Sequence, residues 1–184
     1  MLIILSGFSG TGKNTVINAL LSEEDSKFCS MPTYTTRAMR DGECEGKPYH
    51  FLTKEQFEEK ISSGELYEYE FIHKSYYGSS RKLLAEALSG GKIVIKDIDV
   101  KGALNLKCLL TDQKVVTVFL YVEEDELRKR LLGRGDLPED IDLRMKRYPE
   151  EMEYMKSFDY RINNIDLQRT IEIIKAIADE ESEH

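Results

Sequence analysis

Three mostly apolar runs along the chain are long enough to form buried strands. They cover residues 2–5, 92–98 and 115–122, and stretches with helical periodicity lie between them. Strands that are apolar on both faces are typical of a parallel sheet with helices packed on each side. The alternation therefore predicts an α/β protein with a three-layer core around a parallel sheet.

Helical periodicity is clearest near the two ends of the chain. Residues 15–21 carry apolar side chains densely enough for a buried helix directly after the first strand. Between about residue 166 and 181, Leu167, Ile171 and Ile174 recur at helical spacing. This second helix should therefore pack its apolar face on the sheet.

Two segments depart from the pattern of the core. Residues 31 to about 80 contain short polar and apolar segments around one helical stretch near 54–62, which predicts a small mixed α/β insertion. Residues 124–155 are highly charged and helical, with a break at 133–138 where Pro138 can begin a new helix. A break of this kind predicts a hinge or a helical lid.

The charge and composition of the chain exclude several classes of partner. It has 34 Asp and Glu against 26 Lys and Arg, which argues against a broad nucleic-acid-binding surface. No apolar stretch approaches the length of a membrane span, and the first residues lack the pattern of a signal peptide. We therefore expect a cytoplasmic protein without a membrane or nucleic-acid partner, and the oligomeric state stays open.

The segment G-F-S-G-T-G-K, residues 7–13, follows the first apolar run directly. In the spacing G-x-x-x-x-G-K, glycines let successive backbone N–H groups converge on phosphate oxygens, and the lysine reaches the β- and γ-phosphates. The helix that follows adds its positive N-terminal dipole. We interpret the segment as a nucleotide phosphate-binding loop; a glycine-rich turn that binds nothing is the alternative.

A second group of phosphate-binding candidates lies in the insertion. Arg37 and Arg40 are three residues apart in a segment rich in hydroxyl groups, and Tyr49 follows them. An arginine fork can donate two N–H groups to two phosphate oxygens, and hydroxyls can donate to the others. Taken alone, these residues fit a solvated loop equally well. Tyr76 and Tyr77, before a glycine, likewise fit either a ligand site or packing at a strand end.

Several characteristic segments occur in a fixed order. They are G-F-S-G-T-G-K, T-T-R-A-M-R-D-G-E with Y-H-F after it, G-E-L-Y-E-Y, Y-Y-G-S, D-I-D-V-K-G-A, R-L-L-G-R-G and F-D-Y-R-I-N-N-I-D-L. The series resembles the guanylate kinases, P-loop enzymes that phosphorylate GMP from ATP, and it covers essentially the whole chain. The resemblance implies a single domain over residues 1–184. Within it are a core (1–31, 81–123 and 156–184), a GMP-binding region (32–80) and a lid with flanking helices (124–155).

The resemblance also implies a site for GMP. The residues that would hold its phosphate are Thr33, Arg37, Arg40, Tyr49 and Tyr77. The residues that would contact its base are Glu68, Ser79 and Asp97. A carboxylate at Glu68 can accept hydrogen bonds from the N–H groups of guanine, whereas adenine presents an acceptor there, so the site should discriminate strongly between the two bases.

On the donor side, the resemblance implies a cradle for ATP and a set of cations around the transferred group. The cradle consists of Gly7, Ser9, Gly10, Thr11, Gly12, Lys13, Asn14 and Thr15, with Asn164 near the adenine ring. The catalytic cations would be Lys13, Arg37 and the lid arginines Arg134 and Arg144. A general base is not required, because the attacking phosphate is already an oxyanion at neutral pH.

Mg²⁺ is the expected metal, with Asn14, Asp97 and Asp99 as its candidate ligands. Asn14 departs from the family pattern, because Ser or Thr normally supplies a hydroxyl to Mg²⁺ at this position. A neutral amide is bulkier than a hydroxyl and differently directed, so we expect it to bind the ion through a water. Asp99 has an alternative role as the cap of the next helix.

The function implied is transfer of the γ-phosphoryl group of ATP to GMP, giving ADP and GDP. One alternative is a P-loop kinase for another phosphorylated small molecule, against which Glu68, Ser79 and Asp97 argue. The other is a catalytically silent module of this type that binds phosphorylated protein segments. The intact loop with Lys13 argues against that module.

Overall fold

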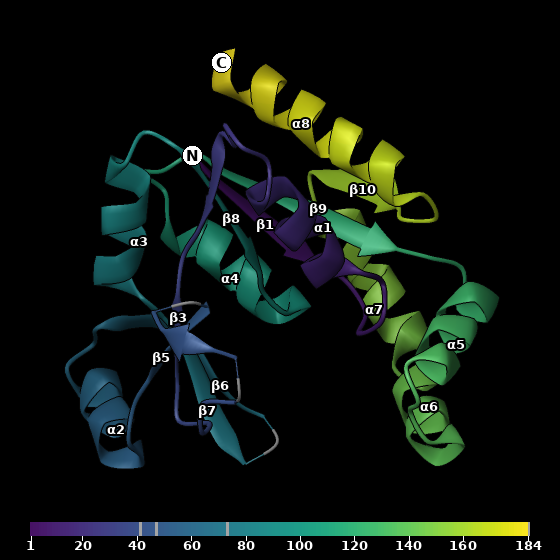
Figure 1. Cartoon of the computed structure of the whole chain (residues 1–184), viewed down its shortest axis with the longest axis horizontal. Coiled ribbons are helices and arrows are strands. Elements are labelled where there is room, and N and C mark those ends of the chain that lie inside the picture. Colours follow the sequence, from purple (N-terminus) through teal and green to yellow (C-terminus); the bar gives the residue numbers. More distant parts are fainter. Residues whose placement is uncertain (41, 47, 73, 184) are drawn as a thin grey trace. The chain divides into compact units, whose positions relative to one another are not determined.

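The computed structural model describes residues 1–40, 42–46, 48–72 and 74–183 (Figure 1). Asp41, the aspartate of the segment T-T-R-A-M-R-D-G-E, lies outside the described residues. The chain divides into two compact units, one formed by residues 1–26 and 95–184 and the other by residues 27–94. Each unit is described by itself below.

A five-stranded sheet in the order β10-β9-β1-β8-β2 forms the centre of the core. β1 pairs with β9 in parallel, with Leu2 opposite Val115, and β10 also pairs with β9 in parallel. Every residue of β1 is buried, as is the interior of β9, because helices cover both faces. The strands are β1 (Leu2–Ser6), β2 (Phe28–Ser30), β8 (Ile93–Asp97), β9 (Val115–Tyr121) and β10 (Tyr160–Asn163).

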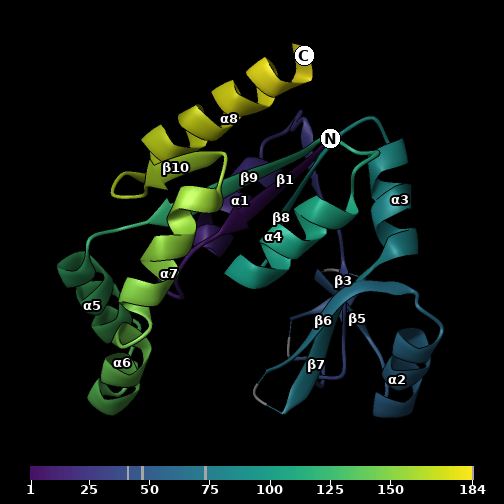
Figure 2. The ribbon, with the colours of Figure 1, turned by 180° about the vertical axis from the view of Figure 1, so that it is seen from behind.

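The helices of the first unit pack on both sides of this sheet. α1 and α8 lie on one face and α4 on the other, as the two opposite views show (Figures 1 and 2). The buried side of α8 carries Ile171, Ile174 and Ile177, which confirms the predicted terminal helix. The helices are α1 (Lys13–Leu21), α4 (Val100–Leu109), α5 (Glu124–Gly133), α6 (Pro138–Met145), α7 (Tyr148–Tyr154), the 3₁₀ turn Met155–Ser157 and α8 (Leu167–Glu183).

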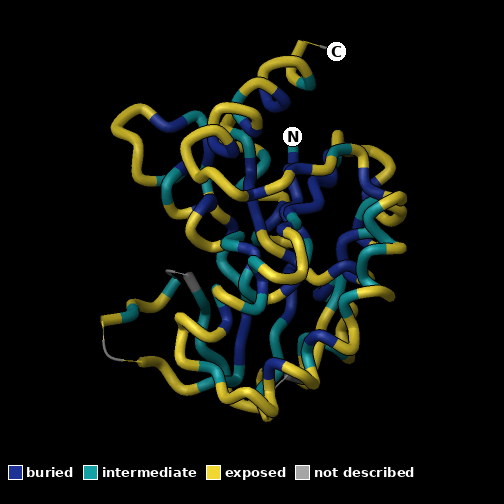
Figure 3. The backbone as a smooth tube through the Cα atoms, turned by 90° about the vertical axis from the view of Figure 1, so that its right-hand side faces the viewer, coloured by how far each residue is buried: buried dark blue, intermediate teal, exposed yellow. Residues whose placement is uncertain are grey.

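The predicted break in the charged segment lies between α5 and α6. α5 ends at Gly133, and Pro138 occupies the first turn of α6. Proline is favoured there because its missing N–H has no partner in a first turn and its fixed φ suits a helix. Burial differs among the strands, since β1 is buried throughout whereas β4 (Cys44–Glu45) is exposed; Figure 3 colours the backbone by burial.

The second unit is built on a mixed sheet with the order β4-β5-β3-β7-β6. β3 pairs with β5 in parallel but with β7 antiparallel, and β6 and β7 form an antiparallel pair. This confirms the mixed α/β character predicted for residues 31 to about 80. The elements are β3 (Thr33–Thr35), β4 (Cys44–Glu45), β5 (Pro48–Phe51), α2 (Lys54–Ser62), β6 (Leu66–Ile72), β7 (Ser75–Ser80) and α3 (Arg81–Ser89).

Helix α2 closes the small core of the second unit. Thr53 accepts from the backbone N–H of Gln56, whose side chain accepts in return from the backbone N–H of Thr53, so the helix begins with a capping box. Phe57 on the inner side of α2 packs with Tyr34 and Leu66. The helix predicted near residues 54–62 therefore has both a start signal and a buried anchor.

Candidate active site

The loop between β1 and α1 depends on the conformational freedom of its glycines. Gly7, Gly10 and Gly12 have φ angles of 127°, 97° and 93°, a region that other residues rarely adopt. A Cβ atom at Gly7 would lie 2.0 Å from the carbonyl oxygen of Leu120 on β9. The backbone of the loop can therefore pass this close to the sheet only with glycine at position 7.

Lys13, the first residue of α1, is folded back onto the loop. Its ammonium donates to the carbonyl oxygens of Gly7 and Phe8, at 2.6 and 2.9 Å. Burial lowers the pKa of Lys13, and the nearby carboxylates of Asp97 and Glu151 oppose that shift. The charge of Lys13 is thus held at the loop by backbone atoms, where a nucleotide phosphate would be bound.

Phe8 anchors the loop to the core. Its ring is buried, stacks on Tyr148 of α7 with 4.6 Å between centroids, and meets Phe119 of β9 edge-on. The backbone oxygen of Phe8 accepts from both the hydroxyl and the N–H of Thr11. Aromatic packing therefore fixes the loop at position 8.

The two arginines predicted to belong to a lid have different partners. Arg144 of α6 donates to the hydroxyl of Ser9 at 2.9 Å, so the structure brings it to the phosphate loop. Arg134, just after α5, forms an ion pair with Asp136. The bond from Arg134 holds the pKa of Asp136 below its usual range.

A pocket beside the loop is lined by residues from three separate segments of the chain, at positions 12–15, 130 and 164–167. Asn164 donates from its side-chain amide to the backbone oxygen of Thr11, at 2.7 Å. Arg130 of α5 donates to the backbone oxygen of Asn164, at 2.9 Å. The pocket is lined by Gly12, Thr15, Arg130, Asn164, Ile165 and Leu167.

Sequence reasoning missed Arg130 as a member of this pocket. The residue is the first letter of the segment R-L-L-G-R-G, so a signal was present. Helical periodicity alone could not show that Arg130 reaches Asn164, which lies 34 positions away in the sequence. The buried side-chain oxygen of Asn164 has no hydrogen-bond partner within the described part of the chain, which leaves an acceptor for a ligand.

The candidate metal ligands lie at three elements of the core. Asn14 is exposed in the first turn of α1, and Asp97 is exposed at the end of β8. Asp99 caps α4, because one of its oxygens accepts from the backbone N–H groups of Lys101 and Gly102 at 2.9 and 3.0 Å. Asp99 therefore acts as the helix cap that the sequence allowed, and its binding of Mg²⁺ stays a prediction.

Glu151 of α7 is a second residue that sequence reasoning missed. It is partly buried, and this burial raises its pKa, while the charge of Lys13 lowers it.

No cluster of three or more potential metal-ligating His, Cys, Asp or Glu side chains occurs among residues 1–40, 42–46, 48–72 and 74–183. An ion here would therefore depend on ligand oxygens as well as protein oxygens.

In the second unit, one group of predicted residues surrounds Arg37. Thr33 of β3 is the register partner of Tyr49 on β5, and the rings of Tyr49 and Tyr77 meet edge-on at 5.9 Å. The guanidinium of Arg37 lies over the ring of Tyr49, 5.2 Å from its centroid. Arg40 lies nearby in sequence, and its side chain is exposed.

A second predicted pair forms on neighbouring strands of the same unit. Glu68 on β6 is the register partner of Ser79 on β7, and the hydroxyl of Ser79 donates to the carboxylate of Glu68. Ser79 is buried, so its hydroxyl fixes one Glu68 oxygen in place. The other predicted base contact, Asp97, belongs to the first unit.

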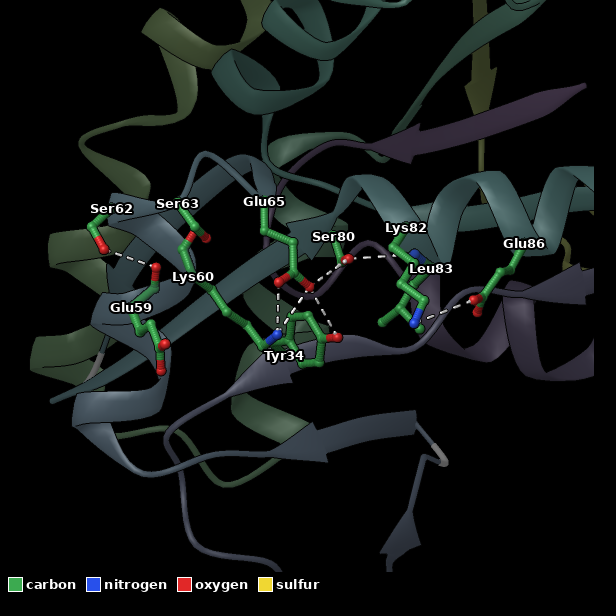
Figure 4. Close-up of polar contacts among 10 residues, drawn as sticks. All are labelled: Tyr34, Glu59, Lys60, Ser62, Ser63, Glu65, Ser80, Lys82, Leu83 and Glu86. Atoms are coloured by element: carbon green, nitrogen blue, oxygen red, sulfur yellow. Dashed lines mark hydrogen bonds and ion pairs between the residues drawn. The ribbon is translucent and has the colours of Figure 1, made fainter.

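A polar network supports the strand that carries Tyr77 and Ser79. Glu65 accepts from Lys60 at 2.8 and 2.9 Å, and also from the hydroxyls of Tyr34 and Ser80 (Figure 4). Ser80 in turn caps α3 by accepting from the backbone N–H of Leu83. Lys60 holds the pKa of Glu65 below its usual range, so this carboxylate ties α2, β3 and β7 together as an anion.

The family model and the relatives similar in sequence point to one family. A family model described as guanylate kinase matches residues 1–181. A guanylate kinase of Helicobacter pylori is 41% identical over 179 residues, which cover 96% of this chain and 85% of that protein. One of Wolinella succinogenes is 39% identical over 178 residues, covering 96% and 82%. The crystal structure of guanylate kinase from Anaplasma phagocytophilum has a TM-score of 0.74 at 30% identity, covering 98% of this chain and 85% of that one.

These matches extend over nearly the whole chain and include the segments that form the loop around Lys13 and the cluster around Arg37. They bear out the α/β fold class and the activity that the order of the segments implied. The chain belongs to the guanylate kinase family.

Proposed function

We propose how this chain carries out the guanylate kinase reaction, the transfer of the γ-phosphoryl group of ATP to GMP. The second unit binds the acceptor GMP, and the loop of the first unit binds the phosphates of ATP. The observation that carries this assignment is the pairing of Glu68 with Ser79 beside the strands that bear Tyr49 and Tyr77. The carboxylate of Glu68 and the hydroxyl groups that we assign to the GMP phosphate then belong to the same sheet.

The acceptor phosphate binds to the cluster around Arg37. Its guanidinium supplies paired N–H donors, and the hydroxyls of Thr33, Tyr49 and Tyr77 donate to the remaining phosphate oxygens. Arg40 adds a second cation from its exposed position. The aromatic face of Tyr49 holds the Arg37 guanidinium in a fixed plane, so the fork is already oriented.

The guanine base binds at Glu68. One Glu68 oxygen is fixed by Ser79, and the carboxylate accepts from the N1–H and exocyclic amine of guanine. Adenine would place an acceptor opposite this carboxylate and leave it unpaired. Because a lost hydrogen bond to a charged group costs about 1.5–3 kcal/mol, the preference for GMP over AMP should be roughly tenfold or more from this residue alone.

On the donor side, Lys13, Arg134 and Arg144 neutralise the charge of the transferring phosphoryl group. An oxygen of the GMP phosphate attacks the γ-phosphorus as the bond to ADP breaks. No proton has to be removed first, because the attacking oxygen is already ionised. Catalysis therefore consists of alignment and electrostatic stabilisation. The pocket lined by Arg130 and Asn164 holds the adenine of ATP.

The residues of the first unit fit a Mg²⁺ ion that arrives with ATP. The exposed carboxylate of Asp97 is a hard oxygen donor at a strand end and lies within electrostatic reach of Lys13. Asp97 would hold the ion, with Asp99 and Asn14 binding through its water shell. The ion would supply charge neutralisation at the β- and γ-phosphates.

A substrate panel tests the proposed function. ADP release is coupled to a spectroscopic signal and measured with GMP, dGMP, AMP, UMP and CMP as acceptors. GMP should give the highest kcat/KM, and AMP and both pyrimidine nucleotides should be poor substrates. Comparable rates with AMP would contradict the guanine assignment. Phosphopeptide binding without ADP release in the presence of GMP would favour the silent binding module instead.

The cellular setting follows from the substrates. None of the described helices is long and apolar enough to cross a membrane. ATP and GMP are small molecules of the cytoplasm, which is where we place the reaction. The protein then needs no nucleic-acid partner.

A further inference from the structure

Glu43 lies at the centre of the cluster that binds the acceptor phosphate in the proposed function. One of its carboxylate oxygens accepts from the guanidinium of Arg37, at 2.7 Å, and the other accepts from the backbone N–H of Arg40, at 2.8 Å. The backbone N–H of Glu43 donates in turn to the carbonyl oxygen of Arg40, at 3.1 Å. One side chain therefore fixes the side chain of one arginine and the main chain of the other.

The pair is sheltered from solvent. The side chains of Arg37 and Glu43 are only 14% and 20% exposed, unlike the more open ion pairs of the helices, so the contact is screened less than a surface pair. The carboxylate of Glu43, and to a smaller degree the hydroxyl of Tyr77, raise the pKa of Arg37. The guanidinium thus stays charged and is held against the rings of Tyr49 and Phe51.

Arg37 keeps donors for a phosphate in this arrangement. A guanidinium has five N–H groups. Glu43 and the carbonyl oxygen of Ala38 each take one, at 2.7 Å, and Tyr77 accounts for one further contact. Among the described residues, at least two N–H groups of Arg37 therefore have no partner, enough for the two-oxygen contact that arginine makes with phosphate.

We propose that Glu43 is a positioning residue for the acceptor phosphate, which orients the fork of Arg37 and sets the place of Arg40. This inference rests on the proposed function, because it assigns the same cluster to GMP. A carboxylate is needed because both of its oxygens accept from N–H donors. A glutamine can satisfy only one of them and turns an N–H group toward the other.

The experiment compares GMP with guanosine, which carries the base without the phosphate. Dissociation constants of both ligands are measured by titration calorimetry for the wild type, Glu43→Gln and Glu45→Gln. Glu45 is a matched control from the same segment. Its carboxylate also contacts one side chain, that of His50, and accepts from one backbone N–H, that of Phe51, but it contacts no arginine. Thermal unfolding of each variant reports whether it is folded.

In the wild type, GMP should bind more tightly than guanosine. Glu43→Gln should reduce this preference by about tenfold through weaker GMP binding, with the affinity for guanosine unchanged. Glu45→Gln should leave both affinities unchanged. A preference for GMP that is unaltered or increased in Glu43→Gln would overturn the positioning role, because an increase would mean that the carboxylate competes with the phosphate.

A double-mutant cycle separates positioning from a general loss of structure. In an Arg37→Ala background, Glu43→Gln should weaken GMP binding less than it does in the wild type, since only the contact of Glu43 with the backbone of Arg40 is left to lose. An equal loss in both backgrounds would mean that Glu43 only supports the fold, which contradicts the proposal. If the wild type itself binds guanosine as tightly as GMP, the proposed phosphate site is wrong, and so is the positioning role of Glu43. A failure confined to Glu43→Gln leaves the proposed function intact.

Discussion

The loop around Lys13 in the first unit and the Arg37 cluster in the second, both proposed to bind phosphate, are built in different ways. The loop around Lys13 is built from backbone groups, with glycines in left-handed conformations and carbonyl oxygens that hold the lysine. The Arg37 cluster is built from side chains: the guanidinium of Arg37 donates to the carboxylate of Glu43 and lies over the ring of Tyr49. The first type of site is encoded in one short segment, and the second requires residues from several strands.

This difference predicts opposite sensitivities to mutation. Small changes in backbone conformation should disable the loop, whereas changes in a single functional group should weaken the side-chain cluster in steps. Variants of the two units therefore test whether the contrast is real.

The largest effect is expected for Gly7→Ala. The new Cβ atom would meet the backbone oxygen of Leu120 at 2.0 Å, and the φ angle of 127° is strained for alanine. We expect a loss of about 4 kcal/mol or more in the free energy of unfolding, together with loss of turnover, measured by denaturant titration and ADP release. Gly133→Ala is the control, since no atom of the described residues outside its own helical turn lies within 4 Å of its Cβ position, and its stability should change by about 1 kcal/mol or less. Equal losses of stability and turnover in the two variants would contradict the claim that the loop depends on glycine at position 7.

Lys13→Met should come next in size, with an effect on the chemical step. The variant keeps the length of the side chain but removes the charge that the loop carbonyls hold. The value of kcat should fall by roughly 100- to 1,000-fold, the range for loss of a group that stabilises transition-state charge. Steady-state kinetics at saturating GMP provides the measurement. A loss of less than about threefold would show that Lys13 lies outside the reacting centre.

Glu68→Gln should have a smaller effect that is confined to the acceptor. Its amide can still accept one hydrogen bond, but it no longer matches both donors of guanine. We expect kcat/KM for GMP to fall by roughly 10- to 100-fold while the KM for ATP stays the same. Glu58→Gln, on the exposed side of α2, is a control for the loss of one negative charge. If the two variants had the same kinetics, Glu68 would not contact the base.

The smallest effect is expected for Asn14→Ser, which restores the usual hydroxyl at an exposed position of α1. Since we expect Asn14 to bind Mg²⁺ through a water, the Mg²⁺ concentration for half-maximal activity should change by only about two- to fivefold. Titration of activity with Mg²⁺ against a chelator measures it. Activity that survives excess chelator, or a wild type that is inactive at every Mg²⁺ concentration while the variant is active, would contradict this view of Asn14.

The same contrast explains what could be predicted from the sequence. The strands β1, β8 and β9, the first and last helices and the conformation of the loop follow from apolar runs and from glycine spacing, which are local properties. Contacts such as that of Arg130 with Asn164 join residues far apart in the chain, and no local sequence pattern predicts them.

Glu43 and Glu151 illustrate this limit further. Glu43 is part of a recognisable segment, but the chain has many glutamates, and only the fold shows that this one pairs with Arg37. Glu151 lies in a charged helix, where sequence alone gives no reason to place it near Lys13. Phe8 lies in a recognisable glycine-rich segment, but its stacking on Tyr148 depends on the packing of α7 and has no local signal.

Separate titrations of ATP and GMP into the wild type, Lys13→Met and Glu68→Gln test the central claim most directly. The claim is that one unit binds the donor through backbone groups and Lys13, and that the other binds the acceptor through side chains. Lys13→Met should weaken ATP binding and leave GMP binding unchanged, whereas Glu68→Gln should weaken GMP binding and leave ATP binding unchanged. Equal weakening of both nucleotides by either variant would contradict the account.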